Sequence, residues 1–347
     1  MRYPEFWQRK AIRSFFLLPF ALLVCWIARR RRARAGRRRG VFCVDRPVFV
    51  IGNLTVGGTG KTPILIALAR LLTERGYRVG VISRGYGVQI GVEPRDVTEA
   101  QGAADVGDEP WLIHERTGLP VMVHPDRVRA AQQLRARYPE VELILSDDGL
   151  QHHRLGRAIQ MAVIDGDRRF GNGFCLPAGP LREPLSALSD MDFVVVNGET
   201  FEPGQWSVRF VLTSVQDLYD GQEYPLADFL NAHQGDTLQA LAGIGHPERF
   251  FEALQSHGAR IKRFPLDDHQ PTPPGLLSYL RRSGMPVVMT DKDAVKWRQN
   301  KPAWHNQPGQ VFAVSGSMLL GEGLIEAIMS RLEAVRITPG AVREKKI

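Results

Sequence analysis

The stretch VIGNLTVGGTGKTP, residues 50–63, decides the expected fold, because in it a strand pattern passes through a glycine-rich turn into a helix pattern. The apolar run over residues 46–54 predicts a short buried strand. The apolar spacing over residues 64–76 predicts a helix that ends at Gly76. Strand, glycine-rich turn and helix in this order form the setting that a phosphate-binding loop requires.

The turn itself resembles the phosphate-loop pattern G-x-x-x-x-G-K-[ST], with Thr55 where the first glycine would stand. The remaining glycines still allow backbone N–H groups to converge on phosphate oxygens. Lys61 supplies a charge for the β- and γ-phosphates, and Thr62 supplies a hydroxyl ligand for Mg²⁺. The alternative is a glycine-rich turn without a ligand. The predicted nucleotide-binding residues are Thr55, Val56, Gly57, Gly58, Thr59, Gly60, Lys61 and Thr62.

Further apolar runs over residues 78–87, 141–155 and 191–198 predict more buried strands, separated by helical stretches. This alternation predicts an α/β fold of the P-loop NTPase type, a parallel sheet with helices on both faces. In such sheets ligands collect at the carboxyl ends of the strands. Asp147 and Asp148 lie at such an end, so we expect them to hold Mg²⁺, with capping of the following turn as the alternative.

Two polar segments outside these strands are further candidates for a site. In DVGDEPWLI, residues 105–113, Asp108 and Glu109 precede the apolar run of a helix. The helix dipole by itself also favours acids in the first turn. The loop LPAGPLREP, rich in proline and glycine, carries Arg182 and Glu183.

The amino terminus combines an apolar run, SFFLLPFALLVCWIA at residues 14–28, with the arginine cluster RRRRARAGRRR at residues 29–39. The run is shorter than the roughly 20 residues of a spanning helix, and Pro19 interrupts it. A signal peptide would carry its charge before the apolar run. We therefore expect a helix in the membrane interface with arginines at anionic headgroups. A buried helix with a solvated basic loop and a nucleic-acid-binding arm are the alternatives.

Composition narrows the class of protein. The 347 residues suffice for two ordinary cores. The formal charge of +8 equals the eight arginines of residues 29–39, so the rest of the chain is nearly neutral. Cys25, Cys43 and Cys175 are too few and too scattered for a disulfide framework or a zinc site, which favours a reducing, cytoplasmic setting.

Together these segments resemble the tetraacyldisaccharide 4'-kinase family, which makes lipid A in Gram-negative bacteria. The resemblance rests on GNLTVGGTGKTP, SRGYG, GDEP, DDGLQHHRL, PAGPLREP, GIGHPERFF, DHQ and TDKDAVK, in that order. It implies that ATP phosphorylates the 4'-hydroxyl of tetraacyldisaccharide 1-phosphate to give lipid IVA. It also implies a peripheral or monotopic protein at the cytoplasmic face of the inner membrane, with no nucleic-acid ligand and no obligate protein partner. The family loop also lacks the first glycine, so Thr55 is no defect.

The resemblance further implies roles for single residues. The base that takes the proton of the sugar hydroxyl corresponds to Asp108, and His269 of DHQ orients it. Without the resemblance, a lone histidine such as His269 is more often structural. Lys61 meets the charge on the transferred phosphoryl group. The expected magnesium ligands are Thr62, Asp147 and Asp148. The residues expected to line the acceptor and phosphate region are Arg84, Tyr86, Glu109, Gln151, Arg182 and Glu183.

The expected organisation has four parts. Residues 1–40 form the membrane-associated helix with its basic cluster, and residues 41–204 form the P-loop kinase domain. Residues 205–315 form a smaller α/β domain, which the resemblance implies is hinged and closes over nucleotide. Residues 316–347 form a C-terminal helix and tail.

Two rival functions lack their sequence features. A GTPase that acts as a switch would carry an N-K-x-D element after a later strand, and neither VVNGET nor MTDKDAVK contains it. A nucleic-acid-binding ATPase would spread basic residues over the catalytic domain, whereas the arginine cluster ends at residue 39.

Overall fold

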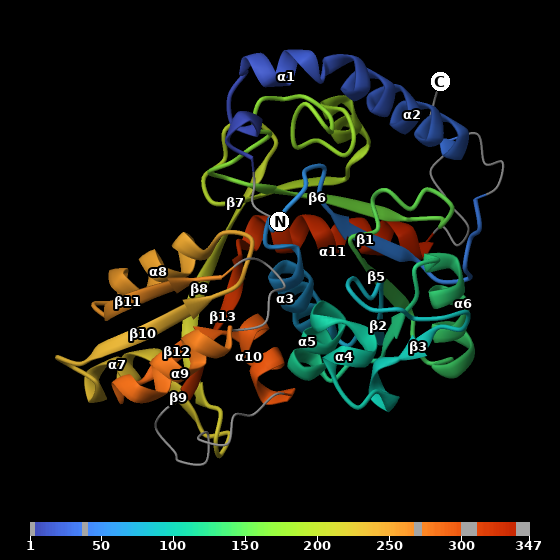
Figure 1. The fold of residues 1–347 in the computed structure, drawn as a ribbon. Helices are drawn as coiled ribbons and strands as arrows, with labels where there is room; N and C mark the ends of the chain where they lie inside the picture. Colours follow the sequence, from blue (N-terminus) through green and yellow to red (C-terminus); the bar gives the residue numbers. More distant parts are fainter. Residues whose placement is uncertain (1–3, 37–40, 267–272, 300–310, 338–347) are drawn as a thin grey trace. The chain divides into compact units, whose positions relative to one another are not determined.

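The computed structural model describes residues 4–36, 41–266, 273–299 and 311–337. The described residues form two compact units, and each contains its own set of hydrogen-bonded strands (Figure 1). The larger unit lies within residues 4–101, 105–209 and 319–337, and the smaller unit within residues 102–104 and 210–318.

The larger unit consists of strands flanked by helices. Its strands are β1 (Val48–Gly52), β2 (Val79–Ser83), β3 (Arg95–Asp96), β4 (Val121–Val123), β5 (Leu143–Asp147), β6 (Ile159–Asp165), β7 (Phe193–Asn197) and the first residues of β8 (Trp206–Asp217). Its helices are η1 (Glu5–Trp7), α1 (Ile12–Phe16), α2 (Leu18–Gly36), α3 (Lys61–Glu74), η2 (Val97–Glu99), α5 (Asp108–Thr117), α6 (Arg127–Arg137), η3 (Leu185–Asp190) and α11 (Glu322–Ile337). The short helix α4 (Ala103–Val106) contains the boundary between the units.

The strands of the larger unit lie in the order β7-β6-β1-β5-β2-β4-β3. All neighbours are parallel except β3, which runs antiparallel to β4. β1, β2 and β5 are buried along their whole length, as expected of a parallel sheet with both faces covered. The α/β fold and the strands expected from the sequence are therefore confirmed, as is the helix now observed as α3. The sequence interpretation did not identify β4 and β6.

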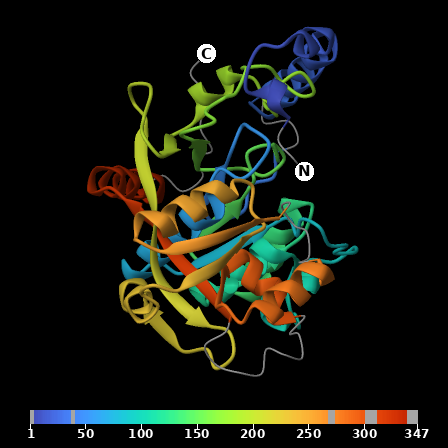
Figure 2. The same cartoon turned by 60° about the vertical axis from the view of Figure 1, so that its left-hand side comes forward.

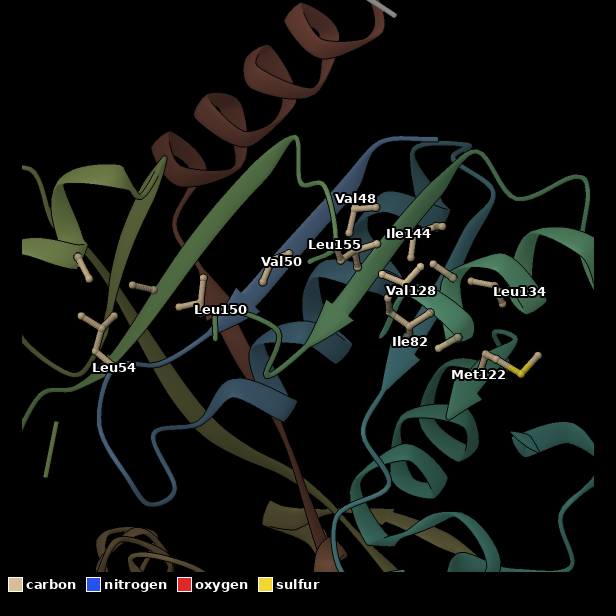
Figure 3. Packing of buried hydrophobic residues seen from close by; sticks show 14 of the residues in the cluster. Val48, Val50, Leu54, Ile82, Met122, Val128, Leu134, Ile144, Leu150 and Leu155 are labelled. Carbon is tan, nitrogen blue, oxygen red and sulfur yellow. The ribbon is translucent and has the colours of Figure 1, made fainter. Parts of the chain in front are cut away.

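The core explains why the turn after β1 is held firmly. Alternate residues of a strand point to opposite faces of the sheet. Val48 and Val50 belong to one buried cluster, together with Ile144 of β5 and Val128 of α6 (Figure 3). Phe49 lies on the opposite side of the strand and is fully buried. Because β1 packs on both faces, the position of its carboxyl end is fixed.

The amino-terminal segment docks on the loops between β6 and β7, as both views show (Figure 1, Figure 2). Trp7 Nε1 donates a hydrogen bond to the Pro177 carbonyl oxygen at 3.0 Å. The first helix, α1, ends at Phe16, and a new helix, α2, begins at Leu18. Pro19 lies in the first turn of α2, where its missing N–H costs no hydrogen bond. Within the described part of the chain, no helix combines the length and the apolar composition needed to cross a bilayer.

The expectation that the cysteines are too few and too scattered for disulfide bonding is wrong for one pair. The structure pairs Cys25 of α2 with Cys175 of the loop after β6 as a disulfide, although they lie 150 residues apart in the sequence. They meet because α2 packs on this loop, with Ala21 buried in the same cluster as Cys175. Cys43 is free and exposed.

The smaller unit has a second set of strands. It consists of the rest of β8, β9 (Glu223–Pro225), α7 (Leu226–Ala232), β10 (Thr237–Ala242), α8 (Pro247–Ser256), β11 (Arg260–Pro265), α9 (Pro274–Ser283), β12 (Val287–Thr290), α10 (Asp291–Gln299) and β13 (Val311–Leu320). The order is β11-β10-β12-β13-β8, and the strands from β11 to β13 are parallel. The stretch LQALAGIGHPERFFEALQSHGARI contains most of β10, a loop and α8.

The carboxyl-terminal helix α11 belongs to the larger unit. Arg331 Nε lies 3.0 Å from Asp192 Oδ1, just before β7. Gly323 lies beside Trp206, whose ring would be 3.3 Å from a Cβ atom added at that glycine. A larger residue at the start of α11 would therefore crowd the first residue of β8.

Candidate active site

Two glycines and two amide side chains hold the shape of the turn between β1 and α3. Gly57 and Gly60 have φ values of 106° and 89°, which side chains with a Cβ rarely adopt. The Asn53 amide donates to the Gly57 carbonyl oxygen at 3.2 Å, and the Asn197 amide donates to the turn at 3.4 Å. Because α3 begins at Lys61, the N–H groups of its first turn have no intrahelical acceptor. They are available to an anion.

The residue that replaces the first glycine has a structural role. Thr55 forms an antiparallel bridge with the loop LPAGPLREP. On one side of it, the Val56 N–H donates to the Pro180 carbonyl oxygen at 2.9 Å. On the other, the Arg182 N–H donates to the Leu54 carbonyl oxygen at 2.7 Å. Extended pairing of this kind needs no positive φ, so position 55 needs no glycine.

Asp148 is the centre of a cluster of opposite charges. Its Oδ1 atom lies 3.8 Å from Lys61 Nζ, and its Oδ2 atom accepts a hydrogen bond at 2.8 Å from Arg182 Nη1. Burial disfavours the charged carboxylate, but Lys61 and Arg182 outweigh burial and lower the pKa of Asp148 to about 2. The structure thus brings together the phosphate-loop lysine, the end of β5 and the LPAGPLREP loop.

Asp147, the last residue of β5, is the more deeply buried of the two acids. Ser83 at the end of β2 donates its hydroxyl proton to Asp147 Oδ2 at 3.1 Å. Burial and the charge of Asp148 raise the pKa of Asp147 to about 6, and Glu109 adds to the rise. The Oδ1 atom of Asp147 is buried and has no hydrogen-bond partner among the described residues. A carboxylate oxygen of this kind beside a second acid can bind a cation.

Arg127, the first residue of α6, supports both acids and was not identified from the sequence. It is 3% exposed, and its Nη2 atom lies 3.4 and 3.5 Å from the main-chain oxygens of Asp147 and Asp148. Asp148 has a φ of 47°, which is uncommon for a residue other than glycine, and Arg127 binds its carbonyl group. A sequence signal existed, because an arginine in the first turn of a helix opposes the helix dipole.

Asp108 begins α5 directly after Gly107, whose φ is 98°. A Cβ atom at Gly107 would lie 3.1 Å from the Tyr86 carbonyl oxygen, so the GDEP segment packs against SRGYG. Arg84 and Tyr86 are exposed at this place. A position in the first helical turn fits both a base and an acid that the helix dipole favours. His269, the expected partner of Asp108, lies outside the described residues.

Gln151 and Glu183 have partners within the protein. The Gln151 amide nitrogen donates to a carbonyl oxygen at the start of the phosphate-loop turn at 3.0 Å, and its oxygen lies 3.4 Å from Arg182 Nη1. Glu183 is buried, 3.3 Å from His153 Nε2 and 3.6 Å from Arg32 Nη1. These contacts connect the LPAGPLREP loop to the turn and to α2.

The fold and the site together define a class of protein. A parallel α/β sheet places a glycine-rich turn with a lysine at the helix start beside a pair of acids at the end of the adjacent strand. This combination is that of P-loop proteins, which bind nucleotides and transfer phosphoryl groups.

Comparison with known proteins specifies the class further. The model of the family LpxK, tetraacyldisaccharide-1-P 4'-kinase, matches residues 13–333. The chain belongs to this family, and the kinase family that the sequence resembled is confirmed.

Relatives and a solved structure agree with this assignment. A tetraacyldisaccharide 4'-kinase of Azotobacter vinelandii is 43% identical over 301 residues, which cover 86% of this chain and 89% of the relative. One of Alkalilimnicola ehrlichii is 44% identical over 305 residues, with the same coverage. The crystal structure of LpxK from Aquifex aeolicus in complex with ATP matches with a TM-score of 0.73 and 25% identity, over 92% of this chain and 99% of that one.

Proposed function

We propose that this protein transfers the γ-phosphate of ATP to the 4'-hydroxyl of tetraacyldisaccharide 1-phosphate and so forms lipid IVA in lipid A biosynthesis. The observation that carries the proposal is the cluster of Lys61, Asp148 and Arg182 beside the phosphate-loop turn. Family membership, the names of the relatives and the relative that was solved with ATP support it.

The turn and the start of α3 bind the triphosphate. Their backbone N–H groups and the positive end of the helix dipole favour phosphate oxygens. Lys61 moves from Asp148 to the β- and γ-phosphates. Asp148 keeps Arg182 as its partner, so this movement leaves no buried carboxylate unpaired. Both cations oppose the negative charge that builds up on the transferred group.

The acids at the end of β5 fit a Mg²⁺ ion. Asp147 and Asp148 each have a buried Oδ1 atom with no hydrogen-bond partner among the described residues, and Mg²⁺ prefers oxygen ligands. Thr62, the second residue of α3, is the third proposed ligand. When bound, the ion neutralises charge on the β- and γ-phosphates.

Asp108 is the proposed base. Its carboxylate takes the proton of the 4'-hydroxyl as that oxygen bonds to the γ-phosphorus, and ADP leaves with the electrons of the broken bond. His269 orients Asp108 in this proposal, which extends the sequence resemblance. Arg84 and Tyr86, exposed beside the start of α5, contact the acceptor, where an arginine suits the 1-phosphate through a bidentate contact. Glu109, near Asp147, acts on the metal or the substrate.

The first two α-helices present an apolar surface for the lipid substrate's membrane. The large apolar side chains exposed on α1 and α2 are Ile12, Phe15, Phe16, Phe20, Leu22, Leu23, Trp26 and Ile27. Exposed arginines of α2 follow them along the helix. We propose that this surface lies in the interface of the inner membrane at its cytoplasmic face, with arginines at anionic headgroups.

The test is a phosphoryl-transfer assay with ATP radiolabelled at the γ-phosphate and tetraacyldisaccharide 1-phosphate in detergent micelles. We expect one labelled lipid that requires Mg²⁺ and is not formed from labelled GTP. ATP hydrolysis without a labelled lipid, or turnover stimulated by DNA instead of lipid, would contradict the proposal.

A further inference from the structure

Arg32 differs from the other arginines of α2. Its side chain is 20% exposed, whereas Arg31 and Arg34 are exposed residues. Arg32 Nη2 donates a hydrogen bond to the Ala187 carbonyl oxygen at 2.6 Å and forms an ion pair with Asp190. This guanidinium is therefore directed into the protein, where it cannot serve a lipid headgroup.

The same guanidinium reaches the segment that carries the phosphate-site arginine. Arg32 Nη1 lies 3.6 Å from Glu183 Oε2, and the Glu183 side chain is only 6% exposed. The preceding residue, Arg182, bonds Asp148 through its side chain and the phosphate-loop turn through its main chain. The contact with α2 and the contact with the charge cluster at the phosphate loop are thus made by consecutive residues.

Other basic groups near Glu183 do not duplicate this connection. Arg157 is half-buried nearby, but its guanidinium donates to the main-chain oxygens of Leu150 and His152 at 2.9 and 2.8 Å. His153 lies 3.3 Å from Glu183 and belongs to the segment after β5. Of these three basic groups, Arg32 is the one that comes from α2. Arg32 also contacts Ala187 and Asp190 of η3.

The helix that carries Arg32 is firmly seated. Ala21 is buried in the core cluster, and Cys25 forms a disulfide with Cys175. A displacement of α2 would therefore be transmitted to residues 175–190 through several contacts, of which the Arg32 ion pairs are nearest to Arg182.

We propose that Arg32 is a positioning residue for phosphoryl transfer, which ties α2 to Glu183 and η3 and so fixes Arg182 at the phosphate site. The inference rests on the proposed function, since its effect is read in lipid phosphorylation. Small misplacements of a charged group at a reacting centre have large effects on rate, and about 1 Å can cost about 10²-fold. Glutamine at position 32 retains hydrogen bonding but neither the charge nor the fork that reaches three acceptors.

The experiment compares Arg32→Gln with Arg75→Gln, which removes the same charge from an exposed residue directly after α3, away from α2. For each variant, kcat and KM are measured in detergent micelles, ATP-binding stoichiometry by equilibrium dialysis, and membrane binding by flotation of anionic vesicles. We expect Arg32→Gln to lower kcat about tenfold or more, within the range above. Vesicle binding and ATP stoichiometry of Arg32→Gln should match those of the wild type, and Arg75→Gln should keep the wild-type kcat.

Arg32→Lys provides the conservative replacement, and part of the lost kcat should return because the charge beside Glu183 and Asp190 is restored. Asp190→Asn weakens the same ion pair from the other side and should lower kcat in the same direction. If Arg32→Gln binds less than one ATP per chain, a folding defect would account for its low kcat. In that case the kcat of Asp190→Asn tests whether the ion pair positions Arg182.

Several results would overturn the inference. These are an Arg32→Gln kcat equal to that of Arg75→Gln, a change confined to vesicle binding or to the KM for lipid, or normal kcat in Asp190→Asn when Arg32→Gln fails to fold. A wild-type protein that phosphorylates no lipid would overturn both the proposed function and this inference. Normal lipid phosphorylation in both glutamine variants would overturn the inference alone.

Discussion

Replacing Lys61 by methionine removes one positive charge from the phosphate loop and keeps an unbranched side chain of similar length. Lys61 Nζ lies 3.8 Å from Asp148 Oδ1, and 13% of its side chain is exposed. In the proposed mechanism this ammonium group also contacts the β- and γ-phosphates of ATP. The substitution therefore has a structural effect on the free energy of unfolding and a catalytic effect on kcat.

The structural effect is small. Two unit charges at this separation attract each other by about 4 kcal/mol at an effective dielectric constant of about 20, and by about 1 kcal/mol in water. The Asp148 side chain is 32% exposed and keeps Arg182 at 2.8 Å, so the lost stability lies near the lower value. A loss of about 1 kcal/mol lowers the Tm of a domain of this size by about 2–4 °C.

The catalytic effect is larger, because the charge faces a phosphoryl group that becomes more negative in the transition state. Removal of a single electrostatic donor from such a site costs about 3–5 kcal/mol, which is about 10²–10³-fold or more in kcat. The assay is transfer of radiolabelled phosphate to tetraacyldisaccharide 1-phosphate in micelles, with Tm measured on the same preparation. Lys61→Arg is the control that keeps the charge.

A Lys61→Met variant that kept more than a tenth of the wild-type kcat would refute the phosphate-loop role of this lysine. A fall in Tm well beyond about 4 °C would instead show that the Lys61 side chain stabilises the fold mainly through packing and not through its attraction to Asp148.

Three further predictions concern the base, the membrane surface and pH. Asp108→Ala should lower kcat about 10²–10⁴-fold with little change in ATP affinity; a helix-capping acid would instead cost about 1 kcal/mol of stability and leave kcat intact. Phe16→Ser with Phe20→Ser should weaken flotation with anionic vesicles at least tenfold, since each exposed ring contributes about 1.5 kcal/mol or more on burial; unchanged flotation would place the membrane surface elsewhere. Burial, assisted by the charge of Arg127, lowers the pKa of His152 from 6.5 to about 4, so protonation favours the unfolded chain and stability falls between these pH values. Urea unfolding should show the wild type losing about 1–2 kcal/mol more than His152→Gln between pH 7 and pH 5, and equal losses would contradict the burial of a neutral imidazole.

Local pattern was sufficient for most elements of the larger unit. The turn after β1 was predictable because glycine spacing and a following apolar helix are local features, and the acids of β5 were predictable because they end an apolar run. β4 was missed because VMV is too short for a period to be recognised. β6, with the sequence IQMAVID, was missed although Gly156 precedes it and the turn signal Asp165-Gly166 ends it, so a local signal was present.

The sequence by itself determined the fold class, the phosphate loop and the family, because these depend on short runs of residues in a fixed order. Only the tertiary structure decided which charges are partners. Asp148 and Arg182 lie 34 residues apart, and Arg32 reaches Ala187 over 155 residues. The arginine cluster is uniform in the sequence, yet packing of α2 buries most of Arg32 and leaves Arg31 exposed. The direction in which a side chain points depends on the surface against which its helix packs, and that surface comes from distant parts of the chain.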